Sequence, residues 1–195
     1  MCTCFLAANL LLVPNTLAKS KKADKASKVK DDSHYQQANQ FIKQGKLDEA
    51  IHEYEEQIKV NSNHANAHNN LANTLIGRGR VQEAIQHFKE AVRIDPKFLE
   101  ARNNLGVALA SVGKTDEAAA QLSEALKQFP NSPDLHNSLG TVLAQQNKMD
   151  DAAHQFSEAL RLRPDFPKAR QNLELAIRAG QTTNQADPKS AGPKR

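Results

Sequence analysis

The sequence predicts an all-α fold, an alpha-alpha superhelix (solenoid) of four helix-turn-helix repeats closed by a C-terminal helix. The same order of small and large apolar residues returns every 34 residues, in four copies. Within a copy, apolar residues recur at helical spacing on both sides of a turn. Aromatic residues make up only 5% of the 195 residues and Trp is absent. A solenoid suits this composition, because each unit is buried only against its neighbours.

The four copies span residues 31–64, 65–98, 99–132 and 133–166. Numbered from each start, position 20 is Ala in every copy, and position 8 is Ala or Gly. Positions 11 and 24 carry large apolar or aromatic residues, and position 32 is Pro in three copies. Small residues at positions 8 and 20 let the two helices of a copy approach closely. One such pair cannot bury its apolar face alone, so the copies are expected to stack.

The pattern at positions 8, 11, 20, 24, 27 and 32 resembles the tetratricopeptide repeat (TPR) family. Two departures fall in the first copy, where Gln57 replaces a small residue and Ser62 replaces Pro. Position 4, usually aromatic in the family, holds His34, His68, Arg102 and His136. The resemblance implies a superhelix whose concave groove binds other proteins, and hence a non-enzymatic adaptor or scaffold.

Turn residues divide each copy into two helices, so nine helices and no sheet are expected. The turn position holds Gly45, Gly79, Gly113 and Asn147. All four tolerate a left-handed backbone. Pro96 and Pro164 are expected to end second helices, because Pro cannot continue a helix. A further helix is expected over residues 167–179, with Glu174 where the copies have Ala or Gly, as a capping helix with one polar face.

The two ends of the chain lie outside the repeats and carry its positive charge. Residues 1–30 hold +5 and residues 178–195 hold +3 of a net +4, which leaves −4 on the residues between. Low apolar content predicts a basic disordered linker at 19–32 and a disordered tail at 180–195. No basic face is predicted on the folded body, so nucleic acid is not an expected partner.

An apolar run at residues 5–13 is followed by Thr16 and Ala18, which predicts a signal peptide over residues 1–18. A bacterial protein exported to the periplasm or secreted is therefore expected, with no stable membrane span after processing. No positive residue precedes the apolar run, so a cytoplasmic protein is the alternative. Cys2 and Cys4 fall inside the signal and are given no role.

No set of residues in the sequence predicts an enzyme, a metal site or a cofactor. His64 and His68 are four residues apart, as in a helical metal-binding pair, but no HExxH motif surrounds them. We expect His68 to fill the aromatic position 4 instead. The other histidines expected on a solvated convex face are His52, His87 and His154. Acidic residues at the start of each second helix are expected to stabilise the helix terminus.

A column of asparagines on the first helices is the candidate peptide-binding site, because those helices line the groove in the family resembled. The candidates occupy positions 5, 6 and 9 and are Asn39, Asn69, Asn70, Asn73, Asn103, Asn104, Asn137 and Asn172. Asn is a mediocre helix former, so propensity does not explain the column. Each amide both donates and accepts, so a row of amides can pair with the main chain of an extended peptide. A plain solvated groove is the alternative.

Two segments, HNNLAN (68–73) and RNNLGV (102–107), are similar to the asparagine ladder in the TPR superhelix of O-linked N-acetylglucosamine transferase. Asn70, Asn104 and Asn172 match the ladder position, whereas Gln36 and Ser138 depart from it. The catalytic domains of that enzyme are absent from this sequence, so the resemblance implies only a mode of binding.

The expected partner is a protein or peptide segment of neutral to basic character. TPR proteins that clamp a C-terminal carboxylate use Lys and Arg where this chain has Tyr35, Glu100 and Asn104. Glu100 also joins Asp32 and Asp134 at position 2, so the groove rim leans acidic. The alternative is a structural, self-assembling protein of the cell envelope, and hence a homo-oligomer.

Overall fold

The computed structural model describes residues 32–185, and the expected signal peptide, nearly all of the basic linker and the last ten residues lie outside that range. The described residues form nine α-helices and no strand, which confirms the all-α class. The helices are α2 (Ser33–Lys43), α3 (Leu47–Val60), α4 (Ala65–Gly77), α5 (Val81–Ile94), α6 (Leu99–Ser111), α7 (Thr115–Gln128), α8 (Pro133–Gln145), α9 (Met149–Leu162) and α10 (Pro167–Gln185).

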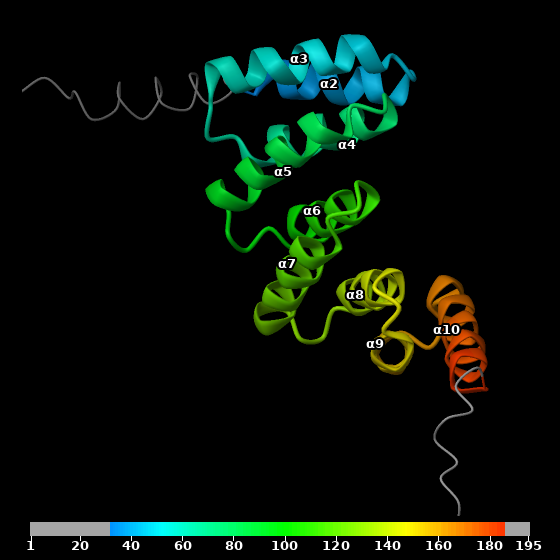
Figure 1. The fold of residues 1–195 in the computed structure, drawn as a ribbon. Helices are drawn as coiled ribbons and strands as arrows, with labels where there is room; N and C mark the ends of the chain where they lie inside the picture. Colours follow the sequence, from blue (N-terminus) through cyan, green and yellow to red (C-terminus); the bar gives the residue numbers. More distant parts are fainter. Residues whose placement is uncertain (1–31, 186–195) are drawn as a thin grey trace, which may run out of the picture.

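The helices pack in sequential pairs that stack into a curved superhelix (Figure 1). The pairs are α2/α3, α4/α5, α6/α7 and α8/α9, here called repeats 1 to 4, and α10 packs on α9. The second helix of each pair also contacts the first helix of the next repeat. We call each contact zone between successive repeats a seam. The predicted solenoid of four repeats and a C-terminal helix is confirmed.

Small residues at positions 8 and 20 bring the two helices of a repeat together. The alanines at position 20 are fully buried in all four repeats. A Cβ added to Gly140 would lie 2.7 Å from Cε1 of Phe156, so α8 and α9 approach too closely for a larger residue. The aromatic shortage follows, because the core is a thin ribbon along the seams.

The turns adopt the backbone that the sequence predicts. The φ angle is 72° at Gly45 and 61° at Asn147, and both lie in the left-handed region. Asn147 is the one non-glycine residue of the described chain with a positive φ. The second helices α5 and α9 end at Ile94 and Leu162, ahead of Pro96 and Pro164.

Polar residues at position 4 replace the family's aromatic residue by bonding to the turn before their own helix. In repeats 2 to 4 and in α10, a side-chain nitrogen lies within hydrogen-bond distance of the carbonyl oxygen six residues earlier. The pairs are His68 with Ser62 (3.2 Å), Arg102 with Pro96 (2.7 Å), His136 with Pro130 (3.0 Å) and Arg170 with Pro164 (2.9 Å). The seam is thus held by a hydrogen bond where the family usually packs an aromatic ring.

Gln57 has a comparable structural use in the first repeat. It is fully buried, and its Oε1 accepts a hydrogen bond from the Tyr35 backbone N–H at 2.9 Å. Tyr35 lies in the first turn of α2, where backbone N–H groups lack helical partners. The departure from a small residue at position 27 therefore stabilises the start of the solenoid.

One histidine does not lie where the sequence placed it. His52 and His154 are exposed, but His87 is half-buried, and its Nδ1 lies 3.1 Å from Nδ1 of His68. The prediction of a solvated position was wrong for His87, because position 23 faces position 4 of the same repeat.

The last helix is longer than the sequence indicated, since α10 continues past Ala179 to Gln185. Gly180, which follows Ala179, does not adopt the left-handed backbone of a helix C-cap, so the helix continues past it. Glu174 is exposed on this helix, as a capping face requires. No helix between residues 32 and 185 combines the length and apolar character needed to cross a bilayer.

Candidate functional site

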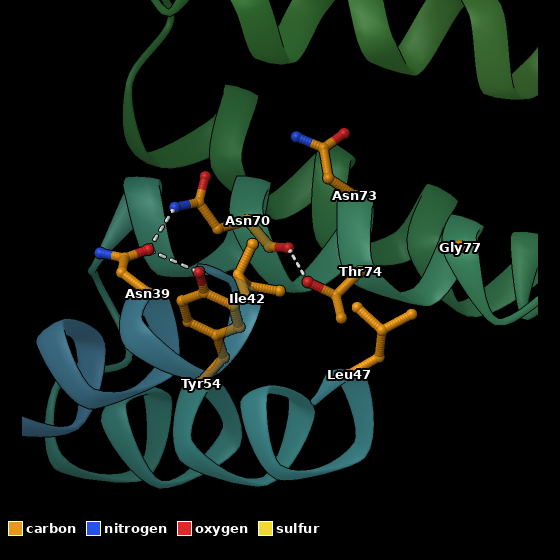
Figure 2. Close-up of a pocket in the computed structure, with 8 residues that line it drawn as sticks. All are labelled: Asn39, Ile42, Leu47, Tyr54, Asn70, Asn73, Thr74 and Gly77. Carbon is orange, nitrogen blue, oxygen red and sulfur yellow. Dashed lines mark hydrogen bonds between the residues drawn. The ribbon is translucent and has the colours of Figure 1, made fainter. Parts of the chain in front are cut away.

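A pocket of about 350 Å³ opens on the groove side of the seam between repeats 1 and 2 (Figure 2). Helices α2, α3 and α4 supply its lining. The lining residues are Asn39, Ile42, Leu47, Tyr54, Asn70, Asn73, Thr74 and Gly77. Three of the predicted asparagines are thus brought together over apolar side chains.

A hydrogen-bond network fixes the amides in this pocket. Tyr54 donates its hydroxyl to Asn39 Oδ1 at 2.6 Å, and Asn70 Nδ2 donates to the same oxygen at 3.3 Å (Figure 2). Asn70 Nδ2 also donates to the Tyr35 hydroxyl oxygen at 3.1 Å. Burial raises the pKa of the Tyr54 hydroxyl, so it remains a proton donor at neutral pH. Asn39 therefore has one defined amide orientation.

The next seam repeats this arrangement one unit further on. Asn104 Nδ2 donates to Asn69 Oδ1 and to Asn73 Oδ1, both at 3.3 Å. At the last seam, Asn172 Nδ2 donates to Asn137 Oδ1 at 3.1 Å. Each asparagine at position 6 thus uses its NH₂ group to join its helix to the preceding repeat.

The seam between repeats 3 and 4 lacks this bond, because position 6 there is Ser138. The acceptor that an asparagine would reach is Asn103 at position 5. Its Oδ1 is buried and has no hydrogen-bond partner among the described residues. The substitution that interrupts the ladder in the sequence therefore leaves an unpaired oxygen in the structure.

Two of the eight predicted asparagines do not line an open groove. Asn69 is 1% exposed and Asn137 is 6% exposed. Asn69 donates to Asn70 Oδ1 and to Glu100 Oε1, at 3.3 and 3.2 Å. The expectation that these two offer their amides to a ligand is corrected: position 5 lies under the seam, where neighbouring helices cover it.

A second pocket, of about 320 Å³, lies between repeat 4 and α10. It is lined by Thr141, Ala144, Met149, Phe156, Asn172, Leu175, Ala176 and Ala179. These residues have the same repeat positions as those of the first pocket, but the amides of Asn39 and Asn73 are replaced by Thr141 and Leu175. The groove therefore has a polar pocket near its start and an apolar one near its end.

Exposed apolar side chains at positions 9 and 12 add to the groove side, a feature that the sequence reasoning missed. These side chains are Ile42, Ile76, Val107 and Leu175, each at least 38% exposed. The signal was present in the sequence, since reading down positions 9 and 12 gives apolar residues between the asparagines. Ile42 and Leu175 also line the two groove pockets, so apolar side chains accompany the amides on this side of the solenoid.

The acidic residues of the rim have partners within the protein. Asp134 pairs with Arg163 at 2.7 Å, and Asp32 lies 3.3 Å from His64 Nε2. Glu100 accepts the Asn69 bond given above. Among the described residues of the rim, only Asp134 is paired with a cationic side chain, and the amide bond from Asn69 leaves the charge of Glu100 in place, so the rim keeps an acidic character.

Within residues 32–185, no three His, Cys, Asp or Glu side chains come together in a way that would hold a metal ion. His64 instead caps α4, accepting the Ala67 backbone N–H at 3.1 Å. The pocket lining holds amides, one phenol, one hydroxyl and apolar groups. This chemistry suits hydrogen bonding and apolar contact.

A solenoid of stacked helix pairs with a lined concave groove defines a helical-repeat scaffold. Two family models described as tetratricopeptide repeat match residues 35–97 and 75–142, which together exceed half of the chain. The chain belongs to the tetratricopeptide repeat family. Neither model indicates a catalytic family, and neither singles out the transferase whose ladder the sequence resembles.

Solved structures share the fold. A crystal structure of MamA is 24% identical with a TM-score of 0.69, and the match covers 76% of this chain and 87% of that one. MamA 41-end from Desulfovibrio magneticus RS-1 is 14% identical, with a TM-score of 0.66 and coverage of 84% and 98%. A tetratricopeptide repeat protein from Parabacteroides merdae is 16% identical, with a TM-score of 0.70 and coverage of 80% and 62%. No curated protein matches the chain.

Proposed function

We propose that this protein is a non-enzymatic adaptor that holds an extended peptide segment of a partner protein in its concave groove. The observation that carries the proposal is the pocket between repeats 1 and 2, where three asparagines surround an apolar floor. TPR proteins mediate protein interactions, and the groove is the concave surface of the fold. Amides beside apolar side chains are complementary to a peptide, which presents main-chain polar groups and apolar side chains together.

The charges of the groove favour a peptide segment of neutral to basic character and do not require a carboxylate end. Of the described rim carboxylates only Asp134 has an arginine partner, and Tyr35, Glu100 and Asn104 occupy the positions where carboxylate clamps have cations. The expected ligand therefore binds through its interior, with apolar side chains facing Ile42 and Leu47.

Filling the pocket tests this proposal. A decapeptide is first selected from a random phage-displayed library against the full chain, and its dissociation constant is measured by fluorescence anisotropy. Gly77→Leu is tolerated by the fold, because a Cβ at Gly77 meets only Leu47 Cδ1, at 3.7 Å. The new side chain occupies the space of one ligand side chain, worth about 1.5–3 kcal/mol, so affinity should fall roughly 10- to 150-fold. Gln86→Leu, on the exposed side of α5, is the matched control and should leave affinity unchanged.

Three results would each contradict one part of this proposal. If no peptide can be selected, the hypothesis of peptide binding is wrong. If Gly77→Leu leaves the affinity unchanged, the peptide does not bind in this pocket. If amidation of the peptide's C-terminus abolishes binding, the protein recognises a terminal carboxylate, as carboxylate clamps do. The alternative, self-assembly, is favoured by Ile177, which is 46% exposed on α10 where a following repeat would pack. A monomer by light scattering at tens of micromolar would exclude it.

A further inference from the structure

We infer that the asparagines of the first pocket have divided roles: Asn39 and Asn73 donate hydrogen bonds to the ligand, whereas Asn70 and Asn104 hold them in position. The inference rests on the proposed peptide binding and assigns the contacting residues within it. It differs from the ladder that the sequence suggested, in which Asn70 and Asn104 themselves bind the peptide.

The first step is that the position-6 donors are already used. A side-chain amide has two N–H hydrogens. Asn70 directs Nδ2 at two acceptors, the Tyr35 hydroxyl oxygen and Asn39 Oδ1. Asn104 directs Nδ2 at Asn69 Oδ1 and Asn73 Oδ1. For either amide to donate to a ligand, a bond across a seam would have to break.

The second step is that the position-9 amides are held with their NH₂ groups free. Asn39 Oδ1 accepts from both Tyr54 and Asn70, and Asn73 Oδ1 accepts from Asn104. Rotating either amide by 180° would place N–H against N–H. Neither Nδ2 has a hydrogen-bond partner within residues 32–185, and Figure 2 shows the Asn39 nitrogen directed away from Tyr54 and Asn70.

The third step is the chemistry of what such a site takes. Asn39 and Asn73 line the same pocket and present donors, so the ligand must supply acceptors. Ile42 and Leu47, which line the pocket with them, call for an apolar side chain between those acceptors. In an extended peptide alternate side chains point the same way, and the main-chain carbonyls beside them are neutral acceptors. The site therefore fits peptide carbonyls flanking one apolar residue.

The test uses aspartate, which keeps the acceptor oxygen of asparagine and removes the donor. In the full chain, Asn39→Asp with Asn73→Asp should lower affinity for the selected decapeptide roughly 5- to 150-fold, from two lost hydrogen bonds. The melting temperature should not fall, because Tyr54, Asn70 and Asn104 keep their acceptors. Gln86→Glu makes the same change from amide to carboxylate at an exposed site on α5, away from the groove, and serves as the control, with unchanged affinity.

The positioning role has its own readout. Asn104→Asp should lower the melting temperature, because a carboxylate would face the oxygens of Asn69 and Asn73. In the ¹H–¹⁵N spectrum of the wild-type protein, the peptide should shift the side-chain NH₂ signals of Asn39 and Asn73 and leave those of Asn70 and Asn104. Asn104→Asp should also move the NH₂ signal of Asn73 before any peptide is added, which general destabilisation would not do selectively.

The outcomes separate this inference from the function on which it rests. Full affinity in the Asn39→Asp, Asn73→Asp variant would overturn the division of roles and leave peptide binding intact. Peptide-induced shifts confined to the NH₂ signals of Asn70 and Asn104 would also overturn the division of roles. They would support the ladder suggested by the sequence, in which Asn70 and Asn104 bind the peptide. If no peptide binds, the proposed function is wrong, and so is the inference that rests on it.

Discussion

Repeat 2 and repeat 4 have the same backbone plan but differ where their side chains meet a neighbouring helix. At position 6, Asn70 joins repeat 2 to repeat 1, whereas Ser138 leaves Asn103 Oδ1 buried and unpaired. At position 23, His87 faces His68 in repeat 2, and Gln155 faces His136 in repeat 4. The fold tolerates both versions, so position 6 adjusts the strength of a seam and position 23 adjusts the contact within a repeat, without changing the architecture.

Converting repeat 2 to the serine version should have the largest effect. Asn70→Ser removes two bonds across the seam, to the Tyr35 hydroxyl oxygen and to Asn39 Oδ1, whereas Asn69 Nδ2, which loses Asn70 Oδ1, keeps Glu100 Oε1 as an acceptor. At about 0.5–1.5 kcal/mol for each bond, the free energy of unfolding should fall by about 1–3 kcal/mol. For a folded region of this size the melting temperature should drop roughly 2–12 °C, measured by circular dichroism. Gln36→Ser, at the exposed position 6 of the first helix that the structure describes, should change it little. An equal drop in both variants would show that the bonds across the seam add no stability.

The reverse change in repeat 4 should have a smaller effect of opposite sign. Ser138→Asn places a donor beside Asn103 Oδ1, as Asn104 does for Asn69. One new bond to a buried, unpaired oxygen should raise the free energy of unfolding by about 0.5–1.5 kcal/mol. Asn103→Ala in the same background should cancel the gain, because the acceptor is then gone. A Ser138→Asn protein less stable than the wild type would mean that this seam has no room for the amide.

The sequence predicted features that follow from local backbone preference and residue size, and missed those that depend on how neighbouring helices are rotated against one another. The left-handed turns at Gly45 and Asn147 follow from local backbone preference, and the small residues at positions 8 and 20 follow from helix approach within a pair. The burial of Asn69 beside the partly exposed Asn70 does not, since it depends on how one repeat rotates against the next. The bond from Asn104 to Asn69 joins residues 35 apart, and no local pattern encodes it. The column of asparagines was therefore visible, but not which of its members are free to bind.

The histidine pair gives the smallest predicted effect, and one confined to acid pH. The Ser62 carbonyl oxygen can only accept, so His68 Nε2 carries a proton and His68 Nδ1 accepts from His87. Two facing imidazoles cannot both be protonated without placing N–H against N–H. In repeat 4, Gln155 can present either its oxygen or its NH₂ to His136, so it accommodates both states of the ring. Acid should therefore weaken repeat 2 more than repeat 4.

The direction of the pH effect follows from the pKa values of the pair. Burial lowers the pKa of both His68 and His87 below the ordinary histidine value. The unfolded chain then binds more protons than the folded chain below about pH 6.5, so stability is full above that pH and falls as the solution is acidified. His87→Gln gives repeat 2 the histidine–glutamine pair found in repeat 4. The melting temperature of this variant should therefore fall less than that of the wild type between about pH 7.5 and pH 5.5. His52→Gln removes an exposed histidine and should leave the loss as in the wild type. If both variants lose as much as the wild type, the acid sensitivity arises elsewhere in the solenoid.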